Sequence, residues 1–445
     1  MSEVRSTTTL EAATAADGIS PSGGARGASA ARDHSAIEGL ARRYRASIPE
    51  RVVHAKGCGA RGTLTITRDL SHLTRARVFS AVGKKTELLI RFSTFAGEAG
   101  AADAERDPRG FAIRFHTEDG DWDIVGGNAP VYFIRDPAKL AALVDAQKRD
   151  PRTNLRSPTA MWDFWSRSPE SLHRITFLFS DRGLPVAPQY MNGHGVHAFS
   201  FLNGIGERRF VKFHFETLQG HRHYTDAEAA DIVGQSRESS QEELSGSIAA
   251  GRLPRWTLAV QVVREENLDP FDPTRVWPHA VAPLVEVGVV ELNRNVENHA
   301  AEIERAAFSP ANLVPGIGLS PDPILRARLD VYADAQRHRL GDDYATFAVN
   351  LAIGAAAPDR TMAVDDPVPC DAAPWRTGVG GLDDDLAQPR ALYALFDAGE
   401  RARLHANIAA SLVGVPEAIV ERLLALFAAV HPDYAAGVRA AMRIG

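Results

Sequence analysis

The sequence has little of several features that would assign it to a class at once. Only two of its 445 residues are cysteine, Cys58 and Cys370, so neither a disulfide framework nor a cysteine-rich metal site can form. No stretch approaches about 18 consecutive apolar residues, and we therefore expect no membrane span. The 50 basic and 56 acidic residues give a formal net charge of −6, which argues against a nucleic-acid partner. We expect a reduced, cytoplasmic protein.

The remaining composition is that of a globular protein with one atypical end. Residues 1–36 are rich in alanine, serine, threonine and glycine and lack the apolar centre of a secretory signal, which predicts a flexible N-terminal arm. Further on, short runs of β-branched and aromatic residues are separated by glycine, proline and aspartate. The predicted strands and hairpins span 86–94, 110–126, 197–217 and 255–263. Such strands without alternating helices indicate an antiparallel sheet or barrel.

The second half of the chain changes character twice. Residues 264–320 are rich in proline and asparagine and predict an irregular segment that wraps a core, followed by a helix over 326–341. The tail reads as three helices, with Pro416 in a first helical turn. The predicted fold is α+β, an antiparallel β-barrel with a wrapping irregular segment and a C-terminal helical bundle. Its predicted parts are an arm (1–36), a barrel domain (37–263), a wrapping segment (264–384) and a helical domain (385–445).

The stretch "RARLDVYADAQRHRLG" (326–341) carries the first chemical signal. On a helix, Arg328, Tyr332 and Arg339 share one face. A guanidinium beside a phenol favours the phenolate, and a phenolate is one of the few protein ligands of ferric haem iron. The other interpretation is a solvated basic helix with one aromatic anchor, which is the more common origin of such a pattern.

The stretch "ERVVHAKGCGARG" (50–62) carries the second signal. It sets His54 among valines and small residues. A neutral imidazole in a dry pocket is a general acid or base near neutral pH. A buried structural histidine would give the same pattern.

Taken together, nine motifs occur in a fixed order along the chain. They are "ERVVHAKG", "RFST" with "AGE", "RDPRGFA", "WDIVGGNAP", "FLFSDRG", "MNGHGVHAF", "VWPH", "LNRN" and "RLDVYADAQRHRLG". In this order they closely resemble the haem catalases of the small-subunit type. The resemblance runs from about Ala41 to Gly341 and resumes weakly from Asp384.

The resemblance implies a role for each matching residue. Tyr332 is then the proximal ligand of a ferric haem b, and Arg328 keeps it ionised, supported by His197 and Asp322. The other implied positions are the haem-propionate arginines Arg51, Arg91 and Arg339, the distal catalytic His54, its hydrogen-bond partner Ser93, and the channel residue Asp107. Barrel residues 37–263 become the haem domain, and segment 264–384 carries the proximal ligand helix.

The chain departs from the family pattern around the implied distal pocket. The family has an asparagine 73 residues after the distal histidine, and here that position is Gly127. Asn128 is adjacent, but neighbouring strand residues face opposite sides, so it is not a simple substitute. Tyr132, Leu140 and Leu143 stand where phenylalanines are usual, and Phe95 replaces a small aliphatic residue. Neutral drift and a remodelled pocket both account for these changes.

Two functions follow, and both are kept open. The first is decomposition of hydrogen peroxide to water and oxygen through a ferryl haem intermediate. The alternative is a catalase-fold haem enzyme that acts on a larger organic hydroperoxide or a biosynthetic intermediate. A haem-carrying binding protein without catalysis fits less well, because His54 and Ser93 are both retained.

The resemblance also bears on partners. It implies a homotetramer held by long N-terminal arms. The external NADPH site of some catalases is matched at five positions, namely His173, Arg182, Asn192, Trp277 and His279. However, His194 replaces a usual tyrosine, and Glu216 replaces a usual lysine with an anion that opposes a phosphate. We therefore do not predict NADPH binding.

Overall fold

The structure is a computed structural model that describes residues 34–45, 47–264, 269–351 and 382–443. The chain divides into two units, residues 1–49 and 50–445. In the first, helix α1 spans His34–Arg45 and carries surface ion pairs from Arg42 and Arg45 to Glu38. Residues 1–33 of the expected arm lie outside the described part, and α1 begins inside the range assigned to it.

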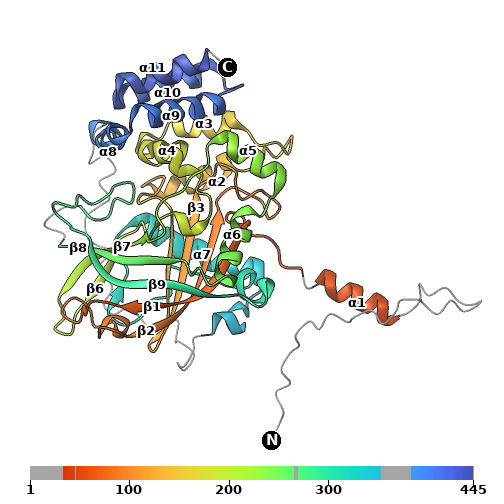
Figure 1. Cartoon of the computed structure of the whole chain (residues 1–445), viewed down its shortest axis with the longest axis vertical. Helices are drawn as coiled ribbons and strands as arrows, with labels where there is room; N and C mark the ends of the chain where they lie inside the picture. Colours follow the sequence, from red (N-terminus) through yellow and green to blue (C-terminus); the bar gives the residue numbers. More distant parts are fainter. Residues whose placement is uncertain (1–33, 46, 265–268, 352–381, 444–445) are drawn as a thin grey trace, which may run out of the picture. The chain divides into compact units, whose positions relative to one another are not determined.

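The second unit is built on a closed antiparallel barrel (Figure 1). Its strands are β1 (Gly57–Ile66), β2 (Lys85–Thr94), β3 (Arg109–Thr117), β4 (Gly120–Gly127), β5 (Gly193–His194), β6 (Phe199–Leu202), β7 (Arg208–Thr217), β8 (Arg255–Val263), β9 (Val285–Asn295) and β10 (Ile317–Gly318). The ring runs β1-β2-β3-β4-β5-β7-β8-β9 and returns to β1. Strand β6 pairs with β7, as β5 does, at a different part of that strand. The predicted antiparallel barrel is confirmed.

Four strands, namely β1, β5, β9 and β10, lie where the sequence analysis expected none, and β9 corrects the predicted boundary. β9 falls inside the supposedly irregular segment 264–320, yet it pairs with β1 and β8 and closes the barrel. The barrel domain therefore does not end at residue 263. β1 was also missed, because "GCGARGTLTI" is rich in glycine. Its residues alternate buried and half-buried, and a Cβ at Gly59 would approach Ile303 Cδ1 to 2.3 Å.

Aromatic residues fill the interior of the barrel. Trp122 is fully buried and stacks on Phe115 at a centroid distance of 4.7 Å, with Phe213 packed edge-on at 5.1 Å. Trp256 is likewise buried, and its indole donates to the Met191 carbonyl at 3.0 Å. Rings of this size exclude water from the barrel and leave room for a ligand outside this core.

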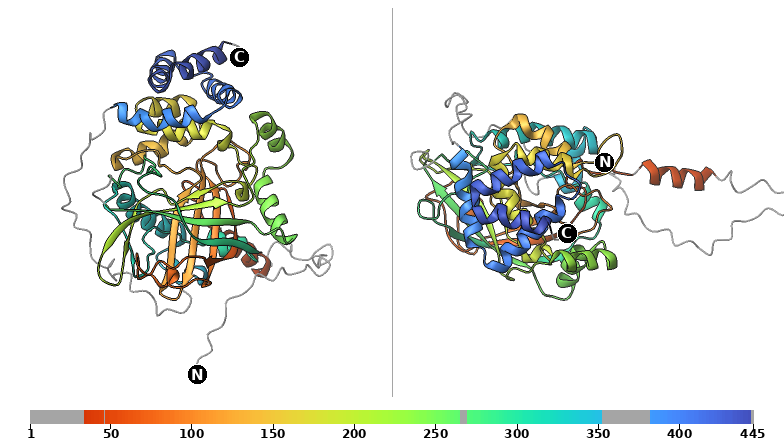
Figure 2. Two further views of the ribbon diagram at one scale, coloured as in Figure 1. Left: turned by 60° about the vertical axis from the view of Figure 1, so that its left-hand side comes forward. Right: turned by 90° about the horizontal axis from the view of Figure 1, so that it is seen from above.

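Helices cover one end of the barrel in two tiers (Figures 1 and 2). The inner tier lies between β4 and β5 in sequence and comprises α2 (Leu140–Gln147), α3 (Pro158–Ser166) and α4 (Leu172–Phe179). The outer tier is C-terminal and comprises α8 (Leu382–Leu395), α9 (Ala398–Ser411), α10 (Glu417–Val430) and α11 (Pro432–Met442). α10 packs on α3, and α8 packs on α4.

The tail has four described helices where three were predicted. The difference arises at His431–Pro432, because Pro432 starts α11 while the extended His431 caps it. The remaining helices are α5 (Asp226–Gln235), α6 (Ser239–Ala249) and α7 (Pro323–Leu340). Within the described ranges, no helix is both long and apolar enough to cross a membrane.

Replacing Trp122 by alanine should lower the free energy of unfolding by about 3–5 kcal/mol, because it leaves a cavity among stacked rings. Denaturant unfolding followed by circular dichroism measures this loss. The control is Ile205→Ala in the β6–β7 turn, where the side chain is 83% exposed and its loss should change little. Equal midpoints for the two variants would contradict the assignment of Trp122 to the core.

Candidate active site

Helix α7 places a phenol and a guanidinium side by side. Asp322 caps the helix, since its Oδ1 accepts from the backbone N–H groups of Ile324 and Leu325 at 2.9 and 3.1 Å. One turn in, Arg328 donates through Nη2 to the Tyr332 hydroxyl at 2.8 Å. The i, i+4 spacing read from the sequence therefore becomes a direct contact.

A chain of buried hydrogen bonds continues from this pair into the barrel. Arg328 Nη1 donates to His197 Nε2 at 2.6 Å, which leaves His197 Nδ1 as the donor to Asp322 Oδ2 at 2.7 Å. Burial lowers the pKa of His197 despite the adjacent Asp322, so the imidazole is neutral in this arrangement. His197 and Asp322 are at most 1% exposed. The four residues that the resemblance grouped together are thus in contact.

His54 lies in the turn that leads into β1, with a left-handed φ of 64°. Its backbone N–H donates to the Phe95 carbonyl at 2.9 Å, and its Nδ1 lies 2.8 Å from Ser93 Oγ. Burial, and then the charges of Arg91 and other basic groups, lower the pKa of His54 to about 3. The imidazole is therefore neutral at ordinary pH, as a proton acceptor must be.

Glycine makes room for this imidazole. Gly110 pairs with Ser93 across β2 and β3, and a Cβ there would come within 2.4 Å of Ser93 Oγ and 2.8 Å of His54 Nδ1. On the other side, Gly110 pairs with Gly127 of β4. Because directly opposite residues in an antiparallel pair face the same side, position 127 faces the imidazole.

Two arginines gather around one carboxylate, that of Glu304, and a third contacts the backbone of the same residue. Arg51 donates to Glu304 Oε2 at 2.8 Å, Arg91 lies 3.5 Å from Oε1, and Arg339 donates to the Glu304 carbonyl at 2.5 Å. Burial and the neighbouring Arg51 lower the pKa of Arg91 to about 9, and its Nε is buried without a partner. Nothing in the sequence singled out Glu304. One carboxylate for three guanidiniums leaves the group short of negative charge.

A cavity of about 660 Å³ is lined by both His54 and Tyr332. All five side-chain departures from the family pattern also line it: Phe95, Gly127, Tyr132, Leu140 and Leu143. Asn128 does not, because its amide oxygen accepts from the Arg109 backbone N–H at 3.3 Å. It therefore does not replace the missing asparagine, as the strand geometry predicted.

The structure shows the contacts of Asp107, for which the resemblance implied a place along the channel. Its carboxylate is buried and accepts from the backbone N–H groups of Ala96 and Gly97 at 2.8 and 3.0 Å. Burial raises the pKa of Asp107 to about 6. It does not line the cavity, although the following Pro108 and Arg109 do. Its carboxylate holds the loop after Phe95 through these two hydrogen bonds.

Sequence reasoning missed Arg174, which also lines the cavity. It sits in α4 within the apolar run "LHRITFLF", where a lone arginine was the available signal. The side chain is 4% exposed, with its guanidinium over the rings of Phe133 and Phe177 at 4.9 and 5.9 Å. Burial lowers the pKa of Arg174 to about 10, and the group remains a cation at neutral pH.

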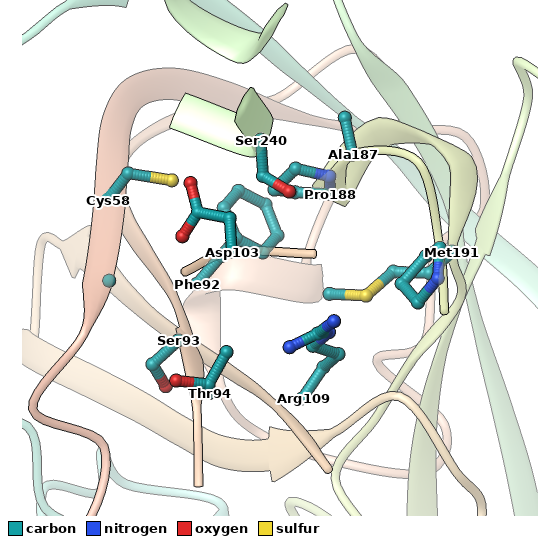
Figure 3. Close-up of a pocket in the computed structure, with 12 residues that line it drawn as sticks. Cys58, Phe92, Ser93, Thr94, Asp103, Arg109, Ala187, Pro188, Met191 and Ser240 are labelled. Atoms are coloured by element: carbon teal, nitrogen blue, oxygen red, sulfur yellow. The ribbon is translucent and has the colours of Figure 1, made fainter. Parts of the chain in front are cut away.

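A second, much smaller cavity of about 30 Å³ lies behind Ser93 (Figure 3). The thiol of Cys58 and the carboxylate of Asp103 point into it from one side, and Arg109 and Met191 from the other. Burial, and then Asp103, raise the pKa of Cys58 to about 12, so the thiol is not a nucleophile. The polar atoms Thr94 Oγ1 and Arg109 Nη1 are buried without protein partners. This volume and lining suit one ordered water.

The residues that match the external NADPH site are largely engaged by the protein. His173 lies 3.3 Å from Gln388 of α8, Asn192 accepts from the Thr217 N–H, and Trp277 is 2% exposed. His194 Nδ1 lies 2.9 Å from His214 Nδ1, and burial lowers the pKa of both imidazoles. The first of these contacts joins α4 to α8, and the histidine pair joins β5 to β7.

This constellation can be compared with known proteins. The family model described as "Catalase" matches residues 7–368, and a second model, "Catalase-related immune-responsive", matches residues 381–442. The chain is 45% identical to a catalase of Aliivibrio fischeri, with 93% of each chain covered. It is 44% identical to catalase A of Pseudomonas putida, with 97% of each covered. A fungal catalase structure superposes with a TM-score of 0.87 at 35% identity, covering 94% of this chain and 92% of that one.

The barrel, the phenol–guanidinium pair and the imidazole–serine pair thus define an oxidoreductase. The chain belongs to the catalase family. Its reaction is the decomposition of hydrogen peroxide, and membership of the family implies a haem.

Gly127→Ala should lower the free energy of unfolding by about 1–3 kcal/mol, because the added methyl overpacks the β3–β4 pair. A Cβ at position 127 would lie only 2.7 Å from the Arg109 carbonyl oxygen, which is backbone and cannot rotate away. The matched control is Gly204→Ala, where a Cβ meets nothing within 4 Å. Thermal unfolding compares the two, and equal midpoints would show that the strand pair has room for a side chain.

Proposed function

We propose that this chain decomposes hydrogen peroxide to water and oxygen on a haem b whose ferric iron is bound by Tyr332. The observation that carries the proposal is the Arg328–Tyr332 contact of 2.8 Å, lining the same cavity as His54. A phenol that accepts from a guanidinium is stabilised as the anion that ferric iron requires.

The charge balance of the site supports a dianionic cofactor. Arg51 and Arg91 share the Glu304 carboxylate, and Arg339 donates to the backbone carbonyl of the same residue. The buried Nε of Arg91 has no partner. Two propionates would supply the missing negative charge with planar acceptors that suit guanidinium donors. The apolar cavity wall, including Val53, Val131 and Val144, suits a porphyrin face. Bound there, the haem supplies the redox chemistry of the reaction.

His54 is the proton carrier in this proposal, and Ser93 orients it. With Nδ1–H donating to Ser93 Oγ, Nε2 remains free to take a proton from peroxide and return it to the departing oxygen. Phe95 packs edge-on against the imidazole at 5.3 Å and limits its rotation. An imidazole held in one orientation lowers the entropic cost of reaching the reactive geometry.

We also propose a homotetramer, which the family resemblance supports, and a cytoplasmic location, which the low cysteine content supports. Sedimentation at micromolar concentration tests the assembly. A stable monomer would exclude it.

Tyr332→Phe should lose the haem, because the change removes the anionic oxygen that binds the iron. Optical titration of the haem-free protein with haemin measures the occupancy. Tyr44→Phe is the control, since that ring is 72% exposed on α1. Full occupancy with an unchanged spectrum in Tyr332→Phe would contradict the proposed ligand.

The pH profile of kcat/KM should show no loss of activity near pH 6.5 from the distal base. The pKa of His54 is lowered to about 3, so the imidazole stays neutral until the pH falls toward that value. Protonation removes the base, and the acid limb should therefore lie below about pH 5. Stopped-flow oxygen evolution from pH 4 to 9 measures it. A limb centred near 6.5 would mean that His54 is solvated rather than buried.

A further inference from the structure

Arg174 is a buried cation without an ion-pair partner among the described residues. Its one hydrogen bond there runs from Nη2 to Asn128 Oδ1 at 3.4 Å, and its Nε is buried without a partner. The negative influences on it are the Tyr132 phenol and then the Asp107 carboxylate, which is already held by two backbone N–H groups. A buried guanidinium in this state is costly to the fold unless a ligand uses it.

The guanidinium points toward the space that Gly127 leaves open. A Cβ at Gly127 would lie 3.8 Å from Arg174 Nη2, and both residues line the large cavity. The rings of Phe133 and Phe177 hold the guanidinium in place. Position 127 faces the His54 imidazole, so the cation borders the region where peroxide reacts.

The rest of the cavity wall near Arg174 is apolar, and no anion there competes with a ligand for the guanidinium. Leu140, Leu143 and Val144 form its wall, and the one lining aspartate, Asp145, is exposed at the rim. Two other arginines line the cavity. Arg109 donates to the Glu105 carbonyl, and Arg328 is engaged by Tyr332 and His197. A ligand that fits here carries one negative group and an apolar body.

We propose that Arg174 forms an anion-binding subsite that selects hydroperoxides bearing a carboxylate. This rests on the proposed haem site and adds a second oxidising substrate to it. The carboxylate binds the guanidinium, and the O–O group lies toward His54. The O–O bond breaks and accepts two electrons and two protons from hydrogen peroxide, so ROOH and H₂O₂ give ROH, H₂O and O₂.

Binding tests the subsite without turnover. Calorimetric titration of the haem-loaded protein with benzoate and with benzamide compares an anion with a neutral analogue of the same size. The wild type should prefer benzoate by about tenfold or more, the worth of one charge-assisted hydrogen bond. Arg174→Met should lose this preference, and Arg174→Lys should keep much of it. The control is Arg152→Met, an exposed surface arginine.

Turnover provides the second test of the subsite. The ratio of kcat/KM for a carboxylate-bearing hydroperoxide to that for its methyl ester should fall about tenfold in Arg174→Met and recover in Arg174→Lys. No benzoate preference in the wild type, or a preference that survives Arg174→Met, would overturn the subsite. An unchanged preference with a melting temperature several degrees lower in Arg174→Met would make Arg174 a packing residue and would also overturn it.

The two proposals fail in distinguishable ways. Absence of a haem Soret band in the wild type counts against the haem site alone. In that case, benzoate binding that depends on Arg174 in the haem-free protein still supports the subsite. Normal haem binding without a benzoate preference that depends on Arg174 counts against the subsite alone.

Discussion

The Asp322 carboxylate is the contact on which the rest of the site depends. It is fully buried, and its two oxygens serve different elements: Oδ1 caps α7 and Oδ2 accepts from His197 of the barrel. A buried carboxylate is tolerated only with such partners, so helix and barrel are fixed to each other by one charge. Arg328 and Tyr332 then follow in the same helix, one helical turn apart from each other. The orientation of the phenol is a consequence of that anchoring.

A second constraint is the shortage of negative charge in the interior. Arg51 and Arg91 share one carboxylate, and Arg339 donates to the backbone carbonyl of the same residue. Arg174 has no carboxylate partner among the described residues. Burying cations in this way weakens the fold unless anionic ligands compensate them. The first group suits the propionates of a haem, while the isolated Arg174 suits a single carboxylate. Cofactor and substrate are thus expected to contribute to stability as well as to chemistry.

Glycine shapes the catalytic side of the barrel. Gly110 accommodates the imidazole of His54 and its serine partner, because any side chain there would overlap both. At Gly127 the neighbouring carbonyl of Arg109 stands close to where a side chain would begin, and the vacated space borders a guanidinium instead. In the proposed subsite, helix α4 rather than the strand therefore offers a polar group to the substrate.

The sequence by itself determined the antiparallel barrel, because hydrophobic alternation and turn residues are local properties. Ordered motifs also indicated the family and grouped Arg328, Tyr332, His197 and Asp322, which the structure brings into contact. Strand β9 was missed because proline and asparagine surround it, and only pairing with β1 and β8 makes it a strand. Glu304 and Arg174 were missed because a charge in a helix has no local signature of what lies across a cavity. Their roles, and the contacts of Asp107, depend on distances between distant segments, which only the tertiary structure decides.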